Sequence, residues 1–435
     1  MPSARDANWI DGLRGVASFI VVTGHLVTAF APHIHSPAPS PTESPALFQL
    51  PIFRLCAAGR GAVALFLLIT GYVNAIGPIA KSRAGNADAA FASIARSSLA
   101  RTGRLVLPTA IATLISWFLA NINAYHMTMH VDATWIRQGW HRQEPTVWAA
   151  ITSLVHAQIS TWTTGWNEYD GTQWSLIYFL IGSMIVYMTM VATVLVTPRA
   201  RKVVYAVLFS YAWMSGQDLA QSALTSMCVT VGMFVAELHN EHGISATSVL
   251  PTPLPATIIL LGMFLCSYPT DAVENAPWSN FMAQIMKPLV PNGADIRRYW
   301  DTIGASLILL GCFFSTNARR LLSSSVFNFL GRVSFPVYLL HNTLIKSVLT
   351  WMVYLPSAMN PPHNEKGEQM DLQRGSTIHI LIAVVVFYYL LYRIAWYWTL
   401  YIDPLCARAV KVITSWAYGD PADNPNHAEK PILIT

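Results

Sequence analysis

Two ionisable residues stand out in the first strongly apolar segment of the chain, DGLRGVASFIVVTGH, residues 11–25. Arg14 and His25 are eleven residues apart. Eleven steps of an α-helix return to within about 20° of the starting direction and advance roughly 16 Å along the axis, so both side chains share one face. A ligand that contacts both must be long, with an anionic group at one end and a reactive group near the imidazole.

His25 lies well inside the apolar segment. Ionisable groups inside a membrane are costly and usually face a polar cavity. An imidazole, with a reference pKa of about 6.5, can take or give a proton near neutral pH. We therefore predict that His25 is a catalytic base. Arg14 is predicted to bind an anionic part of the same ligand, although an arginine at a helix end can also be a snorkelling topological anchor.

A second pair of arginines points to the same kind of ligand. Arg101 and Arg104 are three apart, hence on one helical face, where a predicted membrane span begins. Guanidinium groups bind phosphate oxygens in a bidentate way, which predicts a phosphate or pyrophosphate site. Topological anchoring by positive charge remains the alternative.

Four other residues are candidates for lining the same cavity. His341 and Lys346 lie within another apolar run, so each needs a polar partner inside the protein. His341 could equally hold helices together by a hydrogen bond. The full set of candidate cavity-lining residues is Arg60, Trp174, His341 and Lys346.

No metal site is predicted. His126 and His130 are four apart, but no carboxylate or cysteine accompanies them at a useful spacing. The five cysteines are scattered, which is neither a disulfide framework nor a ligand cluster. The chain also lacks a serine-centred nucleophile elbow and a phosphate-binding glycine loop.

Composition places these residues in a membrane. Hydrophobic residues make up 53% of the chain and charged residues only 11%, whereas soluble domains carry about a quarter charged residues. The net charge of +5 is spread along loops and does not suggest nucleic-acid binding. We expect an all-α, polytopic helical bundle with about ten membrane-spanning helices. The predicted spans are 12–31, 61–80, 105–122, 173–196, 203–216, 219–238, 255–269, 302–316, 333–354 and 377–402.

The basic residues set the expected orientation. Lysine and arginine concentrate in the loops on the N-terminal side, which predicts that both termini are cytosolic. The expected organisation is a short cytosolic segment (1–11), a transmembrane domain (12–402) and a cytosolic tail (403–435) that is disordered from about 419. Asp403-Pro404 is read as a helix stop. On the opposite side, 146–159 is expected to form an amphipathic interfacial helix.

Several ordered motifs resemble a known family. After the opening stretch follow GRGAVALFLLITGYV (59–73), RTGRLVLP (101–108), QWSLIYFLIGSM (173–184), VGMFVAEL (231–238), GRVSFPVYLLH (331–341) and YIDPL (401–405). From about Trp9 to Arg408 the chain resembles the integral-membrane acyltransferase 3 family, especially its fungal branch. The resemblance implies transfer of an acyl group from a coenzyme A thioester to a hydroxyl group. The family's first-span arginine and histidine match Arg14 and His25, and Arg60 matches an arginine common in the fungal branch.

One position departs from the family. Five residues after the tryptophan of the fourth-span motif, Trp174, the family usually has a glutamate, but this chain has Phe179. Phenylalanine cannot titrate or accept a proton. Either that acid is dispensable in this branch, or part of the chemistry has changed.

The resemblance and the residues together predict a multi-pass membrane O-acyltransferase of an endomembrane or the plasma membrane. Its donor substrate would be acyl-CoA, with an acetyl or other short-chain group, and no cofactor would be permanently bound. The acceptor would be a hydroxylated small lipophilic metabolite, in fungal secondary metabolism. A proton-coupled carrier or acyl-group translocator, which forms no bond, is the alternative, because intramembrane His and Arg also suit proton coupling.

Overall fold

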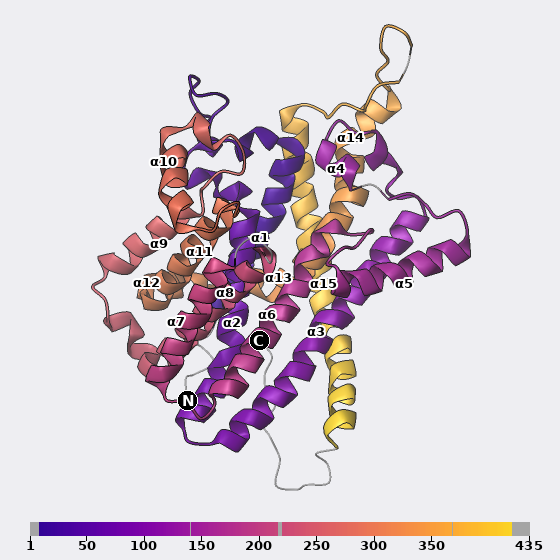
Figure 1. Cartoon of the computed structure of the whole chain (residues 1–435). Helices are drawn as coiled ribbons and strands as arrows, with labels where there is room; N and C mark the ends of the chain where they lie inside the picture. The colour runs from indigo at the N-terminus through magenta and orange to yellow at the C-terminus, as the bar shows by residue number, and fades with distance from the viewer. Residues whose placement is uncertain (1–7, 140, 216–219, 368, 420–435) are drawn as a thin grey trace.

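The computed structural model describes residues 8–139, 141–215, 220–367 and 369–419, which form a bundle of helices without strands (Figure 1). The predicted all-α class is therefore confirmed. The helices are α1 (Asn8–Phe30), α2 (Gly59–Arg83), α3 (Ala87–Asn121), α4 (Thr134–Gln138), α5 (Val147–Thr163), α6 (Leu176–Thr193), α7 (Pro198–Met214), α8 (Ala220–His242), α9 (Pro253–Leu265), α10 (Pro277–Met286), α11 (Ile296–Phe314), α12 (Thr316–Leu322), α13 (Ser325–Leu344), α14 (Thr350–Met359) and α15 (Thr377–Tyr418).

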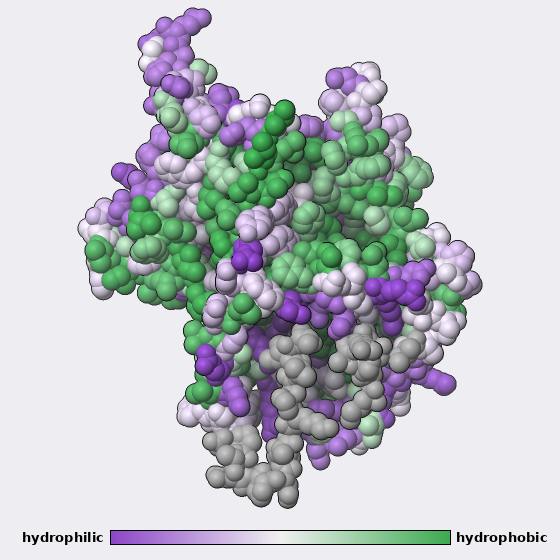
Figure 2. Space-filling view, turned by 180° about the vertical axis from the view of Figure 1, so that it is seen from behind, coloured by the Kyte–Doolittle hydropathy of each residue, from purple (hydrophilic) through white to green (hydrophobic). Residues whose placement is uncertain are grey.

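Within the described ranges, six helical segments are long and apolar enough to cross a membrane. They are Asn8–Phe30, Gly59–Arg83, Ala87–Asn121, Gly171–Thr193, Gln221–His242 and Thr377–Tyr418. Each of the ten spans expected from the sequence falls on a helix or a run of joined helices. The protein is thus a membrane protein, while the count of ten and the cytosolic termini stay predictions. Figure 2 shows apolar side chains over much of the middle of one face, with hydrophilic residues gathered towards its two ends.

The centre of the bundle is a close pair of helices, α1 and α13. A Cβ on Gly15 would stand 2.5 Å from the backbone nitrogen of Gly331, so the two backbones touch there. Ten residues further along each helix, His25 meets His341, which means that α1 and α13 run in the same direction. Residues 15–25 and 331–341 share the pattern Gly-x-x-Ser-Phe-x-Val-x-x-x-His. The same local sequence therefore packs against itself in the same register.

The segments between α3 and α5 and between α14 and α15, together called the cap, close the end of the bundle beyond His25. The loop before α4 pairs with the segment before α15, where the backbone nitrogen of Asp132 donates to the carbonyl of Leu372. Arg374 joins both to the core: its Nε donates to Asp132 Oδ2 at 2.8 Å and its Nη1 to the carbonyl of Phe30 at 2.9 Å. A helix is present near the expected 146–159, as α5, while its position at the membrane interface stays a prediction.

The predicted helix stop at Asp403-Pro404 is wrong. Helix α15 continues through Pro404 to Tyr418, and its last turns lie against α3, where the Tyr418 hydroxyl donates to the carbonyl of Ala95 at 2.8 Å. Proline removes one backbone donor and costs roughly 3 kcal/mol in a helix interior, but here the bonds on both sides of it continue the helix. The tail from residue 420, predicted to be disordered, lies outside the described residues.

Candidate active site

The predicted base and one candidate cavity residue come together. The His25 and His341 rings are stacked, with centroids 5.2 Å apart and planes inclined by 20°. His25 is half-buried, and His341 is fully buried. The close approach of Gly15 and Gly331 brings α1 and α13 near enough for this contact, since the two histidines follow those glycines by the same ten residues.

The hydrogen bond of His341 fixes which ring nitrogen carries the proton. Nδ1 lies 2.7 Å from the carbonyl oxygen of Tyr338, and a carbonyl only accepts, so Nδ1 donates. In the neutral ring Nε2 then holds a free lone pair. This atom is buried and has no hydrogen-bond partner among the described residues. Such an orphan acceptor in a core needs an explanation, and a bound donor would supply one.

A tryptophan from the cap also stacks with His25. The Trp135 ring, on α4, lies 4.9 Å from the His25 ring with an interplanar angle of 20°. The imidazole thus stacks with both Trp135 and His341. Contacts of this kind limit rotation of the ring.

Lys346 is buried five residues after His341 in the chain, and its expected interior partner is present. It lies on a π-helical segment, Ile345–Leu349, where Nζ donates to the carbonyl of Tyr169 at 3.2 Å and stands 5.6 Å from the centre of the Tyr125 ring. Single π-helical turns within helices often occur at functional sites. Gly139 of the cap packs directly over it, since a Cβ there would lie 3.0 Å from Lys346 Cε.

The buried carboxylate of Asp170 anchors α13. Asp170 Oδ1 accepts from Asn342 Nδ2 at 2.7 Å and from Thr172 Oγ1 at 2.7 Å. Asp170 is 0% exposed, and Asn342 directly follows His341. The carboxylate therefore fixes α13 at the level of the histidine pair.

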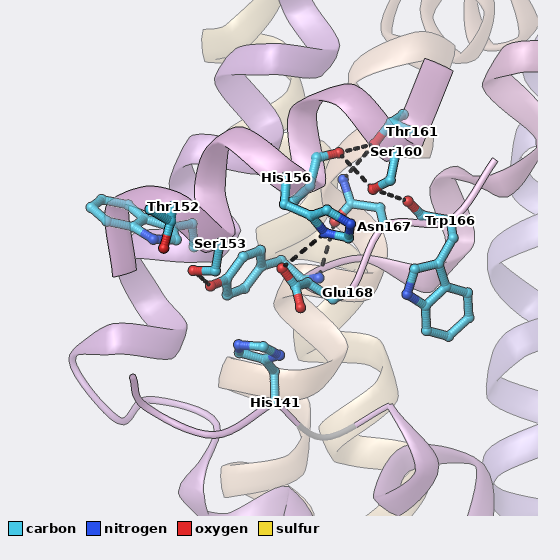
Figure 3. A network of polar contacts seen from close by, with 12 residues as sticks. His141, Thr152, Ser153, His156, Ser160, Thr161, Trp166, Asn167 and Glu168 are labelled. Atoms are coloured by element: carbon cyan, nitrogen blue, oxygen red, sulfur yellow. Dashed lines mark hydrogen bonds and ion pairs between the residues drawn. The ribbon is translucent and has the colours of Figure 1, made fainter. Parts of the chain in front are cut away.

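Figure 3 shows how the chain before Asp170 is held against α5. Asn167 Nδ2 donates to Thr161 Oγ1 at 2.9 Å, and Ser160 Oγ donates to the carbonyl of Trp166 at 2.6 Å. Ser153 Oγ and the Tyr169 hydroxyl are 2.6 Å apart. These bonds position Tyr169 and Asp170, and so the partners of Lys346 and Asn342.

Two titratable groups of this loop respond to their surroundings. Burial raises the pKa of Glu168, which nearby His156 partly opposes. Burial also lowers the pKa of His141, although Glu144 favours its charged form. The His141 ring lies 4.2 Å from the Tyr169 ring (Figure 3). Both groups line the outer side of the network rather than the histidine pair.

The three arginines expected to bind phosphate gather at the other end of α1. Arg14 and Arg104 are within electrostatic range of the Arg101 guanidinium. Arg14 Nη2 donates to the carbonyl of Gly331 at 3.2 Å and pairs with Asp11 at 3.0 Å, while Arg101 Nε donates to Ser183 Oγ at 3.3 Å. A basic cluster and an imidazole pair are thus about three helical turns apart, roughly 16 Å.

The other candidates have different neighbours. Arg60 pairs with Asp295 at 2.9 Å in an exposed position, as expected of an interfacial anchor. Trp174 is half-buried beside Tyr178, with ring centroids 6.0 Å apart. Neither contact brings these residues to the histidine pair.

Phe179 belongs to the packing behind the site. It is 7% exposed, and its ring lies 5.9 Å from Phe66 and 6.4 Å from Tyr338. Tyr338 is the residue whose carbonyl orients His341. An aromatic side chain therefore supports the site where the family usually has an acid.

Trp135 and Asp170 were missed by the sequence analysis. Both lie in the loop between α3 and α6, far from any apolar pattern that would place them near His25. The repeated pattern that ends in His25 and His341 was the available signal for the pairing. No group of three or more metal-binding side chains occurs in the ranges that the structure describes.

The comparison with known proteins decides the family. The model of an acyltransferase domain, acyltransferase 3, matches residues 7–396. The chain belongs to the acyltransferase 3 family. It is 26% identical to the acyltransferase R4 of Phoma sp. over 397 residues, which cover 78% of this chain and 82% of that protein. The acyltransferase clz18 of Cochliobolus lunatus is 24% identical over 400 residues, with the same coverage of 78% and 82%.

A third fungal relative matches a shorter stretch. The O-acetyltransferase PaAT-1 of Phomopsis amygdali is 31% identical over 147 residues, 34% of this chain and 29% of that protein. No solved structure matches the chain. The family and its relatives identify the protein as an acyltransferase, and its apolar helices place it in a membrane.

Proposed function

We propose that this protein transfers an acyl group from acyl-CoA to a hydroxyl of a small lipophilic metabolite. The observation that carries the proposal is the stacked pair of His25 and His341, whose one fixed ring leaves a buried Nε2 without a partner. A hydroxyl group donates to such an acceptor. The supply of both a base and a hydroxyl-binding atom favours direct attack of an alcohol on a thioester.

In the proposed reaction the reacting hydroxyl donates its one proton to the unprotonated nitrogen of His25, while a second hydrogen-bond donor of the acceptor molecule binds His341 Nε2. His25 removes the hydroxyl proton as the oxygen attacks the thioester carbonyl. The new C–O bond forms and the C–S bond breaks. The proton then passes from the His25 imidazolium to the departing thiolate, which leaves as coenzyme A, and both histidines return to their starting state.

The basic cluster is suited to the other end of the donor. Arg14, Arg101 and Arg104 would bind the phosphates of coenzyme A by charge-assisted hydrogen bonds. The roughly 16 Å between Arg14 and His25 along α1 would be bridged by the extended arm that carries the thioester. The donor would enter from the side where the basic cluster lies, which we take to be cytosolic.

The relatives support the proposed acyl group and acceptor. One of them is named as an O-acetyltransferase, which supports an acetyl or other short-chain group and a hydroxyl acceptor. All three come from fungi. By analogy, the proposal places this protein in fungal secondary metabolism.

The test is release of coenzyme A by the purified full-length protein. Labelled acetyl-CoA is incubated with candidate hydroxylated metabolites, with His25→Ala and with His156→Ala as a matched control, because the His156 side chain is 69% exposed on α5. We expect acceptor-dependent release that His25→Ala abolishes and His156→Ala leaves intact. Near-normal turnover by a well-folded His25→Ala protein would end the proposal. Uptake of substrate into vesicles without thioester consumption would favour a carrier instead.

A further inference from the structure

A groove lies on the surface between α13 and α15, apart from the histidine pair. Its volume is about 420 Å³, within the roughly 300–1,000 Å³ of most small-ligand pockets. Five of its six lining residues are aromatic: Phe329 comes from α13, and Tyr388, Tyr389, Tyr392, Arg393 and Trp396 come from α15.

The α15 residues of the groove recur every three to four positions, so they form one face of that helix. In its most apolar stretch, α15 has only 22% of its residues buried in the protein. A helix this apolar that buries so little must present most of its surface to lipid. The groove therefore opens towards the membrane.

Two guanidinium groups border the groove. Arg393 lines it, and its Nη2 donates to the Tyr397 hydroxyl at 3.1 Å. The Arg332 guanidinium stands 5.9 Å from the ring centre of Trp396. Neither arginine forms an ion pair with a carboxylate in the described part of the chain. An arginine without an ion-pair partner in a membrane protein is costly, so an anionic partner would be favoured.

The groove also offers an unused hydrogen-bond donor. The hydroxyl oxygen of Tyr392 is buried and has no partner among the described residues. An unsatisfied buried group costs about 1–3 kcal/mol. Two cations and an unpaired hydroxyl between aromatic walls suit an anionic head with an apolar tail.

The height of the groove in the bundle agrees with a headgroup. Arg332 directly follows Gly331, whose carbonyl accepts from Arg14. Arg14 of α1 and Arg332 of α13 therefore lie at one level, near the end of the bundle where the basic cluster lies. This is where the phosphates of one leaflet would be.

We propose that this groove binds an anionic phospholipid, with its phosphate between Arg332 and Arg393 and an acyl chain along the aromatic rings. The bound lipid would stabilise the catalytic helix. Tyr388 of the groove shares a hydrogen bond of 2.7 Å with Thr23, two residues before His25, and its ring stacks on Phe19 at 5.3 Å.

The test uses delipidated full-length protein in a neutral detergent. Its melting temperature is measured with added phosphatidylglycerol, phosphatidylcholine or inorganic phosphate. The double variant Arg332→Gln with Arg393→Gln is compared with Arg408→Gln, which makes the same change at an exposed position of the same helix. We expect phosphatidylglycerol to raise the melting temperature by several degrees in the wild type and Arg408→Gln, but not in the double variant.

Three results would overturn the proposal. They are an equal rise with phosphatidylcholine, an equal rise with inorganic phosphate, or an undiminished response of the double variant. Should the double variant fail to fold, Tyr392→Phe removes only the hydroxyl group. Native mass spectrometry should then show phosphatidylglycerol bound more weakly to Tyr392→Phe than to the wild type, and unchanged binding would contradict the proposal.

Discussion

At the scale of the residue, the central feature is an imidazole held by a carbonyl beside a second imidazole held by stacking. His341 has one nitrogen committed to Tyr338 and one free. His25 has no such orienting bond to the residues that the structure describes, and it stacks with Trp135 and His341. The proposed division of labour follows: His341 Nε2 holds the acceptor molecule through a second donor group, and His25 takes the proton of the reacting hydroxyl.

Replacing His341 with glutamine tests this division. Glutamine keeps an acceptor atom but cannot titrate, and it loses the fixed ring. We expect kcat/KM for the acceptor to fall 10- to 100-fold, since a lost hydrogen bond of about 1.5–3 kcal/mol corresponds to that range. The KM for acyl-CoA should not change. Full activity of His341→Gln would show that the ring only packs α13 against α1.

A substitution of Arg101 tests the proposed binding of the acyl-CoA phosphates. With acyl-CoA as donor, Arg101→Gln should raise KM about 10- to 100-fold, because a charge-assisted hydrogen bond to phosphate is worth roughly 1.5–3 kcal/mol. With an acyl-pantetheine, which has no phosphate, the variant and the wild type should behave alike. An equal loss with both donors would assign Arg101 a structural role.

At the scale of the element, the pairing of α1 with α13 positions both histidines. The backbones meet at Gly15 and Gly331, where even one methyl group has no room. The predicted chemistry therefore depends on two glycines that do no chemistry themselves.

Gly15→Ala should weaken this contact. The added Cβ would lie 2.5 Å from the nitrogen of Gly331, so the helices must separate; overpacking of this kind typically costs about 1–3 kcal/mol. We expect a lower melting temperature and a loss of kcat that exceeds the loss of folded protein. Gly77→Ala on α2 is the matched control, since a Cβ there meets nothing within 4 Å. Equal behaviour of the two variants would argue against the helix contact.

The helices and their apolar faces could be predicted from the sequence, but the contacts between the helices could not. Arg14, His25 and the basic pair on α3 follow from helical spacing, which is a local property. The contact of His25 with His341 joins positions more than 300 residues apart, and Trp135 reaches the site from the five-residue helix α4, which is too short to show an apolar period. The predicted helix end at Pro404 was wrong because the preference of proline for a helix end is local, and the long apolar helix α15 continues through it.

At the scale of the whole molecule, the end of the bundle opposite the cap is tied by a buried ion pair. Glu237 is 0% exposed and Arg201 is 1% exposed, and Oε2 accepts from Nη1 at 3.0 Å. Arg83 reaches the other oxygen at 2.8 Å. Three helices, α2, α7 and α8, are joined there. The ion pair gives Glu237 a structural role in holding these helices together.

Adjacent residues allow a direct comparison of buried and exposed pairs. Arg201→Gln leaves Glu237 partly unpaired in the core and should cost about 3–5 kcal/mol. Lys202→Gln breaks only a pair whose side chains are 29% and 39% exposed, which is typically worth about 0–1 kcal/mol. Thermal inactivation in detergent should separate the two clearly. Similar losses would mean that the buried pair does not hold the helices.

The pH dependence of kcat/KM for the acceptor tests the central claim most directly. A base must be unprotonated to act, so activity should be full above the pKa of the histidine pair and fall as the pH is lowered through it. The residual rate of His25→Ala should lack this dependence. A His25→Ala protein with the same pH profile and a rate near that of the wild type would contradict the account.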